Sequence, residues 1–254
     1  MPNNAYNIHW ASMAENPLKI LIVDDENDII SILSMGFEKL GCQVISANSA
    51  TDGILKYKEQ KPELVLSDIR MPGKASGFDL LKAVKTLNPN QPVALMTGFS
   101  DIPPSEMYHE GAFAVFPKPF DRNQIVETML KSLKPLADRL ADKAPLGSAK
   151  LEKTFPGLSQ AAEAHQFNLG SGGFFVANFI EAEKGKLVSF KINFQGGSPS
   201  ALEGVGQVKW VRKAGTENLK PGSGIEFLFL TDGCKVAVSD FIKNAQPKSF
   251  IPTN

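Results

Sequence analysis

The chain has 254 residues, which is enough for two domains of ordinary size. Its 27 Lys and Arg residues balance its 27 Asp and Glu residues, so net charge favours neither nucleic acid nor an acidic membrane surface as a partner. Cys42 and Cys234 match no metal-binding spacing and are interpreted as reduced thiols, with a single disulfide as the alternative. No apolar run is long enough to span a bilayer and no signal-peptide pattern is present, so we expect a cytoplasmic protein.

The first sixteen residues show no periodicity and predict a disordered leader or a tag. From residue 17 to residue 134, five short apolar runs alternate with segments of helical spacing. Such a β-α alternation predicts a doubly wound, five-stranded parallel sheet of the flavodoxin-like type, with helices on both faces. The runs lie at 20–23, 44–46, 64–67, 93–96 and 113–116.

Four of the five predicted strands end in a residue that carries chemistry. Asp24 and Asp25 follow the first strand, Asp68 the third, Thr97 the fourth and Lys118 the fifth. Ligands of open α/β sheets bind at the carboxyl ends of the strands. Clustered carboxylates are tolerated around a divalent cation, and hard oxygen ligands favour Mg²⁺. With a nearby ammonium and hydroxyl, the set suits phosphoryl transfer to a carboxylate.

This constellation resembles the response-regulator receiver domain. The resemblance implies that Asp68 is the phosphoacceptor, that Thr97 and Lys118 bind the phosphoryl oxygens, and that a histidine kinase is the donor. Mg²⁺ would be held by Asp24, Asp25 and Asp68 and by the backbone carbonyl of Arg70. It also implies a cis bond between Lys118 and Pro119.

Two positions depart from the family pattern. A glycine usually follows the phosphoacceptor at a fixed distance, and Gly77 comes one residue late. The fifth strand commonly carries an aromatic residue that turns inward on phosphorylation, and Val115 stands at that position. Phe113 and Phe116 are expected to point elsewhere, because side chains alternate along a strand.

Residues 135–149 are expected to form a helical linker. An apolar stripe of Met129, Leu133, Leu136 and Leu140 continues beyond the fifth unit, and Pro135 is expected to kink it. The plain interpretation is a last receiver helix followed by a linker helix. The alternative is a homodimer contact through this stripe.

Residues 150–246 change in composition, with dense Gly and little helical periodicity. Runs at 174–176, 187–194, 205–212 and 225–230 predict strands, and 236–244 predicts a closing helix. The expected architecture is a small antiparallel β-barrel rather than a helix-turn-helix. Residues 247–254 are expected to be a loose tail.

Residues 168–176, 206–211 and 221–227 carry, in this order, a Gly-Gly turn, a Val-x-Trp strand and a Gly-Ile-Glu-Phe strand. They resemble a PilZ domain, and the resemblance implies cyclic di-GMP as a ligand. Its binding motifs are only partly present. Lys143 stands where a second Arg is expected, and Lys does not reproduce a bidentate guanidinium contact. The candidate nucleotide-binding residues are Arg139, Lys143, Asn168, Gly170, Ser171 and Gly173.

The sequence therefore predicts a non-enzymatic two-component response regulator, phosphorylated on Asp68, with a PilZ-like output domain that is a candidate for cyclic di-GMP binding. The alternative is a phosphorylation-gated protein-interaction module that has lost nucleotide binding. The downstream partner is not identified by the sequence. A solvated face for Arg139 and Lys143, and a simple hairpin turn for 168–173, are the structural interpretations of the same residues.

Overall fold

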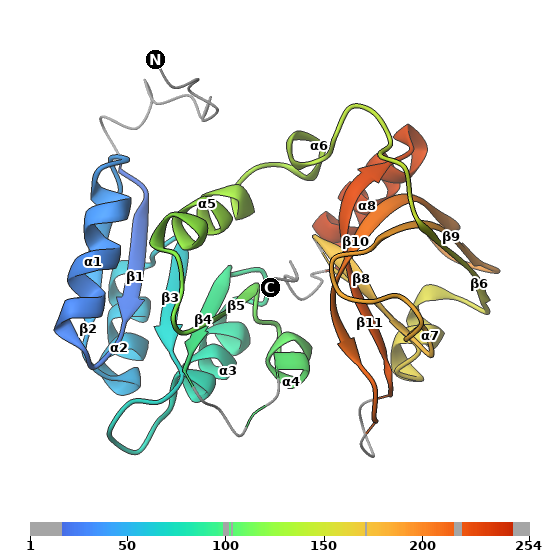
Figure 1. Cartoon of the computed structure of the whole chain (residues 1–254). Coiled ribbons are helices and arrows are strands. Elements are labelled where there is room, and N and C mark those ends of the chain that lie inside the picture. Colours follow the sequence, from blue (N-terminus) through green and yellow to red (C-terminus); the bar gives the residue numbers. More distant parts are fainter. Residues whose placement is uncertain (1–16, 99–101, 103, 171, 216–219, 246–254) are drawn as a thin grey trace.

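The computed structural model of the chain describes residues 17–98, 102, 104–170, 172–215 and 220–245. It contains two domains, each built around its own sheet (Figure 1). The predicted leader and the predicted tail lie outside the described residues. Within the ranges just given, no helix combines the length and the apolar character needed to cross a bilayer.

The N-terminal domain is a five-stranded parallel sheet in the order β2-β1-β3-β4-β5, which confirms the prediction. Its central strands are buried almost throughout, as expected for a sheet that helices cover on both faces. The strands are β1 (Lys19–Val23), β2 (Gln43–Ala47), β3 (Leu64–Asp68), β4 (Val93–Thr97) and β5 (Ala114–Pro117). The helices are α1 (Asn27–Glu38), α2 (Ala50–Gln60), α3 (Gly77–Leu87), α4 (Pro104–His109) and α5 (Arg122–Ser132).

Side-chain caps fix where the helices next to the sheet edge begin. Ser76 and Asp79 form a capping box at the start of α3. The carboxylate of Asp121 accepts a hydrogen bond from the backbone N–H of Asn123 at the start of α5. These caps satisfy first-turn N–H groups of α3 and α5 locally. The side chains at the strand ends are therefore not needed as caps for these two helices.

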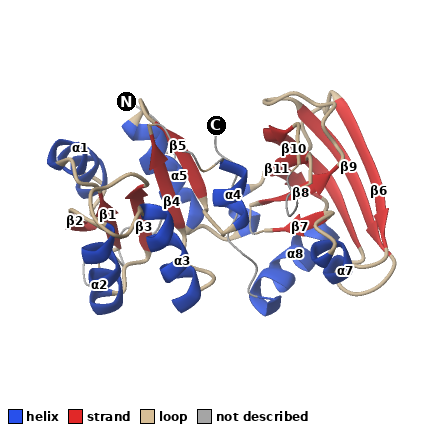
Figure 2. Cartoon of the chain, turned by 90° about the horizontal axis from the view of Figure 1, so that it is seen from below, coloured by secondary structure: helices blue, strands red, loops and turns tan. Residues whose placement is uncertain are grey.

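Two apolar layers cover the sheet (Figure 2). On one face, α1 and α5 contribute Phe37 and Ile125. On the other face lie side chains of α2, α3 and α4, among them Tyr57 and Met107. Val115 belongs to this second cluster, whereas Phe113 and Phe116 belong to the first, so both Phe side chains point away from Val115 as predicted. Alternation along β5 accounts for Phe116, but not for Phe113, which precedes the strand and is two residues from Val115.

The C-terminal domain is a six-stranded sheet in the order β6-β9-β10-β11-β8-β7. Its strands are β6 (Ala149–Phe155), β7 (Phe167–Leu169), β8 (Gly173–Ala177), β9 (Leu187–Phe194), β10 (Ala201–Arg212) and β11 (Gly222–Leu230). Two helices accompany them, α7 (Leu158–Glu163) and α8 (Asp232–Ala245). The sheet curls until its two edge strands approach each other. The ring centroids of Phe155 on β6 and Phe167 on β7 lie 5.6 Å apart.

The prediction of a wholly antiparallel sheet is wrong at one edge. β6 pairs in parallel with β9, while the other strand pairs are antiparallel. The sequence interpretation also missed β6, α7 and β7. β6 reads as polar, because Lys150 and Glu152 are exposed on its outer side, although Leu151 and Phe155 are buried on its inner side.

The predicted apolar stripe does not form one continuous surface. α5 ends at Ser132, and a separate short helix, α6 (Leu136–Arg139), follows Pro135. Met129 is buried in the N-terminal domain and Leu136 in the core of the C-terminal domain. These two residues are therefore not available for a contact between two copies of the chain. Self-association through the rest of this region stays a prediction.

Both cysteines are free and buried. Burial raises the pKa of Cys42 from 9.0 to about 11, so its reactive thiolate is depleted about a hundredfold at neutral pH. We expect Cys42 in the folded chain to react with a thiol reagent at least about a hundredfold more slowly than after denaturation. Reaction of Cys42 at the rate of the denatured chain would contradict this burial.

Candidate functional site

The carboxyl ends of four neighbouring strands meet at one edge of the N-terminal sheet. Asp68 is the last residue of β3 and Thr97 the last residue of β4. Asp24 follows β1 directly and Lys118 follows β5 directly. The peptide bond between Lys118 and Pro119 is cis, as predicted. The strand order places these ends side by side, and the ion pairs described next show that Lys118 reaches two of the carboxylates.

The ammonium of Lys118 lies between two buried carboxylates. Its Nζ is 2.8 Å from Oδ1 of Asp68 and 3.1 Å from Oδ2 of Asp24. The side chains of Asp24 and Asp68 are 0% and 6% exposed. Glu26 approaches the same ammonium at 3.5 Å, and sequence reasoning missed it because it follows the predicted acidic pair and reads as part of the next helix.

The electrostatics of this pair follow from burial. Burial raises the pKa of Asp68, and hydrogen bonding and charge from Lys118 oppose the shift without cancelling it. Burial also lowers the pKa of Lys118, but its hydrogen bonds to Asp68 and Asp24 outweigh burial and leave that pKa raised. Lys118 therefore keeps its charge, while Asp68 holds a carboxylate that burial makes less stable.

The remaining predicted residues surround this pair with different exposure. The Thr97 hydroxyl oxygen is buried and has no hydrogen-bond partner among the described residues. The backbone N–H of Arg70 donates a hydrogen bond to the Asp68 carboxylate, and the Arg70 side chain is exposed. Asp25 is exposed beside Asp24. The site thus offers an acceptor carboxylate, a fixed cation and an unsatisfied hydroxyl.

In the described part of the chain, no three His, Cys, Asp or Glu side chains form a ready-made metal cluster. The oxygen donors still fit a hard cation in their chemistry. Asp24 and Asp68 carry two buried negative charges opposite the single ammonium of Lys118, and Asp25 is exposed next to them. The assignment of Asp24, Asp25, Asp68 and the Arg70 carbonyl as Mg²⁺ ligands stays a prediction.

Gly77 is held against the backbone of Asp68, the predicted phosphoacceptor. A Cβ built on Gly77 would lie 1.8 Å from the carbonyl oxygen of Asp68. The Gly77 N–H also donates a hydrogen bond to the Ile69 carbonyl, so the backbone has little room to retreat. The glycine that comes one residue late in the sequence therefore still occupies a position that requires glycine.

We expect Gly77→Ala to destabilise the N-terminal domain by about 2 kcal/mol, because the added methyl group forces the backbone of Asp68 to move. Urea unfolding measures this loss. Gly98→Ala is the matched control, since its Cβ would meet no atom closer than 3.9 Å and the change should stay within about 0.5 kcal/mol. Equal stability of the two variants would contradict the steric account.

Residues 20–130 match the family model of the response regulator receiver domain. Sporulation initiation phosphotransferase F of Bacillus subtilis is 34% identical over 116 residues, which are 45% of this chain and 93% of that protein. The chain belongs to the response regulator receiver family. Its N-terminal domain is the receiver domain of a two-component response regulator, and such a domain takes its phosphoryl group from a donor such as a histidine kinase.

Longer regulators match the same region. NtrC of Klebsiella pneumoniae is 33% identical over 129 residues, or 50% of this chain and 27% of NtrC. GlrR of Escherichia coli is 27% identical over 150 residues, and the match spans 34% of its length. Among solved structures, the receiver domain of NtrX from Brucella abortus is 28% identical and covers 45% of this chain and 97% of that chain, with a TM-score of 0.42.

The candidate nucleotide-binding residues are only partly brought together. Arg139 lies near Glu226, which pairs with Gly173 across β8 and β11. Burial lowers the pKa of Arg139 to about 10, and the negative charge of Glu226 opposes that shift. Gly170 donates a backbone hydrogen bond to the carbonyl of Gly173.

The other three candidates do not add to this cluster. Asn168 and Lys143 are exposed, and Ser171 lies outside the described residues. Gly173 has a structural reason of its own, because a Cβ there would lie 2.1 Å from the carbonyl oxygen of Ile225. Close strand pairing thus accounts for Gly173 without any ligand.

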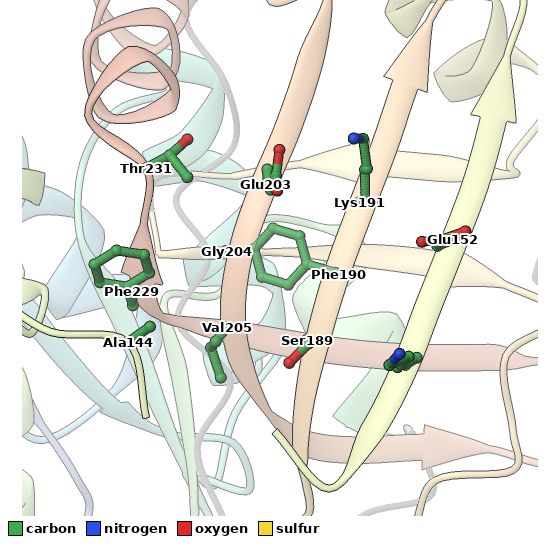
Figure 3. A pocket seen from close by; sticks show the side chains of 11 residues that line it. Ala144, Glu152, Ser189, Phe190, Lys191, Glu203, Gly204, Val205, Phe229 and Thr231 are labelled. Carbon is green, nitrogen blue, oxygen red and sulfur yellow. The ribbon is translucent and has the colours of Figure 1, made fainter. Parts of the chain in front are cut away.

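A separate open groove of about 420 Å³ lies on the curled sheet of the C-terminal domain (Figure 3). Lys150 and Lys191 line it together with Glu152 and Glu203. Because its charges are balanced, the groove has no marked preference for an anion such as a nucleotide phosphate. None of the five predicted nucleotide-binding residues that the structure describes lines this groove.

Proposed function

We propose that the chain is a cytoplasmic response regulator in which Asp68 accepts a phosphoryl group from a histidine kinase, with Mg²⁺ as cofactor. The phosphorylation state then controls the C-terminal domain, which we propose is a PilZ-like output module. The observation that carries this proposal is the contact of Lys118 with both Asp68 and Asp24, beside the buried hydroxyl of Thr97, which has no hydrogen-bond partner in the part of the chain that the structure describes.

The chemistry requires few groups, because phosphoryl transfer depends mainly on positioning and charge. An Asp68 oxygen forms the new P–O bond as the donor's P–N bond breaks. Lys118 is placed to neutralise charge on the phosphoryl oxygens, and Thr97 has a free donor for one of them. Mg²⁺, when bound by Asp24, Asp25, Asp68 and the Arg70 carbonyl, would supply further charge neutralisation.

The full-length chain should therefore incorporate phosphoryl from a small acyl phosphate only when Mg²⁺ is present. Peptide mapping should place the group on the segment that contains Asp68. A chain that takes no label with Mg²⁺ present, or that takes it on another segment, would contradict the assignment of Asp68.

For the output domain, the arrangement around Arg139 favours the nucleotide-blind alternative, which is a protein-interaction module that does not bind cyclic di-GMP. The negative charge of Glu226 already accompanies this guanidinium, and Lys143 is exposed. We accordingly propose that the C-terminal domain acts by binding a protein partner, without catalysis of its own and without contact to nucleic acid. Cyclic di-GMP remains the competing ligand, supported by the Gly-rich turn and the PilZ-like order of motifs.

Calorimetry with cyclic di-GMP and the full chain separates the two proposals. No binding heat at high ligand concentration is the expected result. Saturable binding that weakens in Arg139→Ala or Asn168→Ala would instead establish a nucleotide site and overturn the nucleotide-blind proposal.

A further inference from the structure

The receiver and the C-terminal domain meet through a stack of aromatic rings. Tyr108 on α4 lies parallel to Trp210 on β10, with ring centroids 6.1 Å apart and planes 5° apart. Phe175 on β8 continues the stack at 5.5 Å from Trp210. The guanidinium of Arg212 lies 5.3 Å from the Trp210 ring centroid. Trp210 thus stacks on a receiver ring. A second ring contact joins the same helix to the C-terminal domain, because the ring of His165 lies 6.1 Å from that of His109 on α4.

Gly224 makes room for the indole of Trp210. The two residues are paired across β10 and β11, and the register of these strands shifts between Val208 and Trp210. A Cβ on Gly224 would lie 2.3 Å from both Nε1 and Cε2 of the indole. Any larger residue at this position would displace the ring. The indole of Trp210 can therefore lie where it does only because residue 224 is glycine, and we call this position the seat of Trp210.

A charged contact joins the same two domains beside the stack. Glu226 of β11 has a side chain that is 10% exposed, and it lies 3.5 Å from Lys131 of α5. Lys209 of β10 approaches the same carboxylate at 3.4 Å. A nearly buried carboxylate between cations of two domains favours one relative arrangement, because separation would leave it without part of its charge compensation.

The stack is continuous with the packing below the phosphoacceptor. Trp210 packs against the receiver cluster that contains Tyr108, Val115 and Ile69. Ile69 follows Asp68 directly in the chain, and its N–H donates to the carbonyl of Met96 at the end of β4. One packed cluster therefore reaches from the residue next to Asp68 to the indole of the other domain.

We propose that Trp210, seated on Gly224, is a latch on the receiver, and that phosphorylation of Asp68 releases it from Tyr108. This inference rests on the proposed function. A phosphoryl oxygen on Asp68 would give the Thr97 hydroxyl an acceptor, which it lacks among the described residues, and would draw the end of β4 toward it. Because α4 follows β4 and its side chains share the packed cluster, this shift moves Tyr108 against the indole.

Fluorescence of Trp210 tests the latch in the full-length chain. Trp10 and Trp210 are the two tryptophans, so Trp10→Phe leaves Trp210 as the sole indole emitter. We expect an acyl phosphate with Mg²⁺ to shift this emission to the red, and we expect no shift after adding Asp68→Asn. Phosphoryl incorporation is measured in the same samples.

The outcomes separate the latch from the proposed function. Incorporation on Asp68 without a change in Trp210 emission would overturn the latch and leave the proposed function standing. Absence of incorporation would overturn both.

Two glycine substitutions, one beside the indole and one in open space, test whether Gly224 positions Trp210. Gly224→Ala should show red-shifted emission before phosphorylation and little further change after it, because the indole is already displaced. Gly233→Ala should respond like the unmutated chain, since its Cβ would meet no atom within 4 Å. Identical emission of the two variants would contradict the role of Gly224.

Hydrogen exchange of α4 supplies a readout that does not depend on Gly224→Ala folding or on fluorescence. Loss of the stack in Trp210→Ala should speed exchange of the α4 amides about tenfold. Phosphorylation of the unmutated chain should give an increase of the same kind. Unchanged α4 protection in both samples would overturn the latch.

Discussion

Replacing Asp68 by Asn is expected to abolish phosphoryl incorporation and, at neutral pH, to stabilise the receiver. The first effect follows because an amide offers no carboxylate oxygen to form the P–O bond. The second follows because burial raises the pKa of Asp68, so the ionised carboxylate costs folding free energy that Asn does not. Labelling with an acyl phosphate and urea unfolding measure the two effects.

The gain in stability should depend on pH in a defined direction. A carboxyl with a raised folded pKa binds protons more tightly in the folded state, so its contribution is favourable below the unfolded value of 3.8 and is lost as pH rises through the folded value. The advantage of Asp68→Asn should therefore be full at pH 7 and shrink as pH falls toward 3.8.

Asp121→Asn is the matched control for both readouts. Asp121 caps α5 through its bond to the N–H of Asn123, and Asn is an equally good capping residue. This variant should keep full labelling and nearly unchanged stability. Labelling that survives in Asp68→Asn would contradict the phosphoacceptor assignment, and a loss of stability in Asp68→Asn at pH 7 would contradict the direction of the pKa shift.

Lys118→Ala is expected to cost about 3 kcal/mol of receiver stability at neutral pH, because it leaves the buried carboxylates of Asp24 and Asp68 without their shared cation. The loss should diminish in acid, because the raised pKa of Asp68 lets this carboxyl group take up a proton and it then no longer needs the ammonium. Combining it with Asp24→Asn should recover part of the loss, since one of the two buried charges is then removed. Urea unfolding of the two single variants and the double variant gives the coupling.

Lys56→Ala is the control for loss of a lysine as such. Lys56 lies 2.8 Å from Asp52, the same distance as Lys118 from Asp68, but both side chains of the Lys56–Asp52 pair are partly exposed. An exposed pair one helical turn apart contributes only about 0.5 kcal/mol. A similar cost for Lys56→Ala and Lys118→Ala would show that burial does not set the strength of the Lys118 contact.

Sequence reasoning identified the receiver site because each of its residues follows an apolar run. A buried strand has a recognisable pattern, and the residue at its end is fixed by that pattern, so Asp68, Thr97 and Lys118 could be placed on one edge without coordinates. Glu26 was not identified, because only the position of Lys118 in space brings the two together.

Sequence reasoning was weaker in the C-terminal domain. β6 has its apolar residues, Leu151 and Phe155, among charged ones on an edge, and a short polar strand after a linker looks like more linker. The contact of Tyr108 with Trp210 joins residues a hundred positions apart, and no local pattern indicates such a pair. Glu226 read as an ordinary strand residue, although it lies between Lys131 and Lys209.

The parallel pairing of β6 with β9 has a consequence for the order in which the C-terminal domain folds. β9, β10 and β11 follow one another in the chain and pair as neighbours, so they can associate over short loops. β6 pairs with β9 only after residues 156–186 are closed into a loop, and β8 pairs with β11 across a still longer stretch of chain. Closing these long segments costs entropy before any pairing compensates it. We therefore expect β6, the strand that follows the linker from the receiver, to join a sheet whose central strands β9, β10 and β11 have already paired.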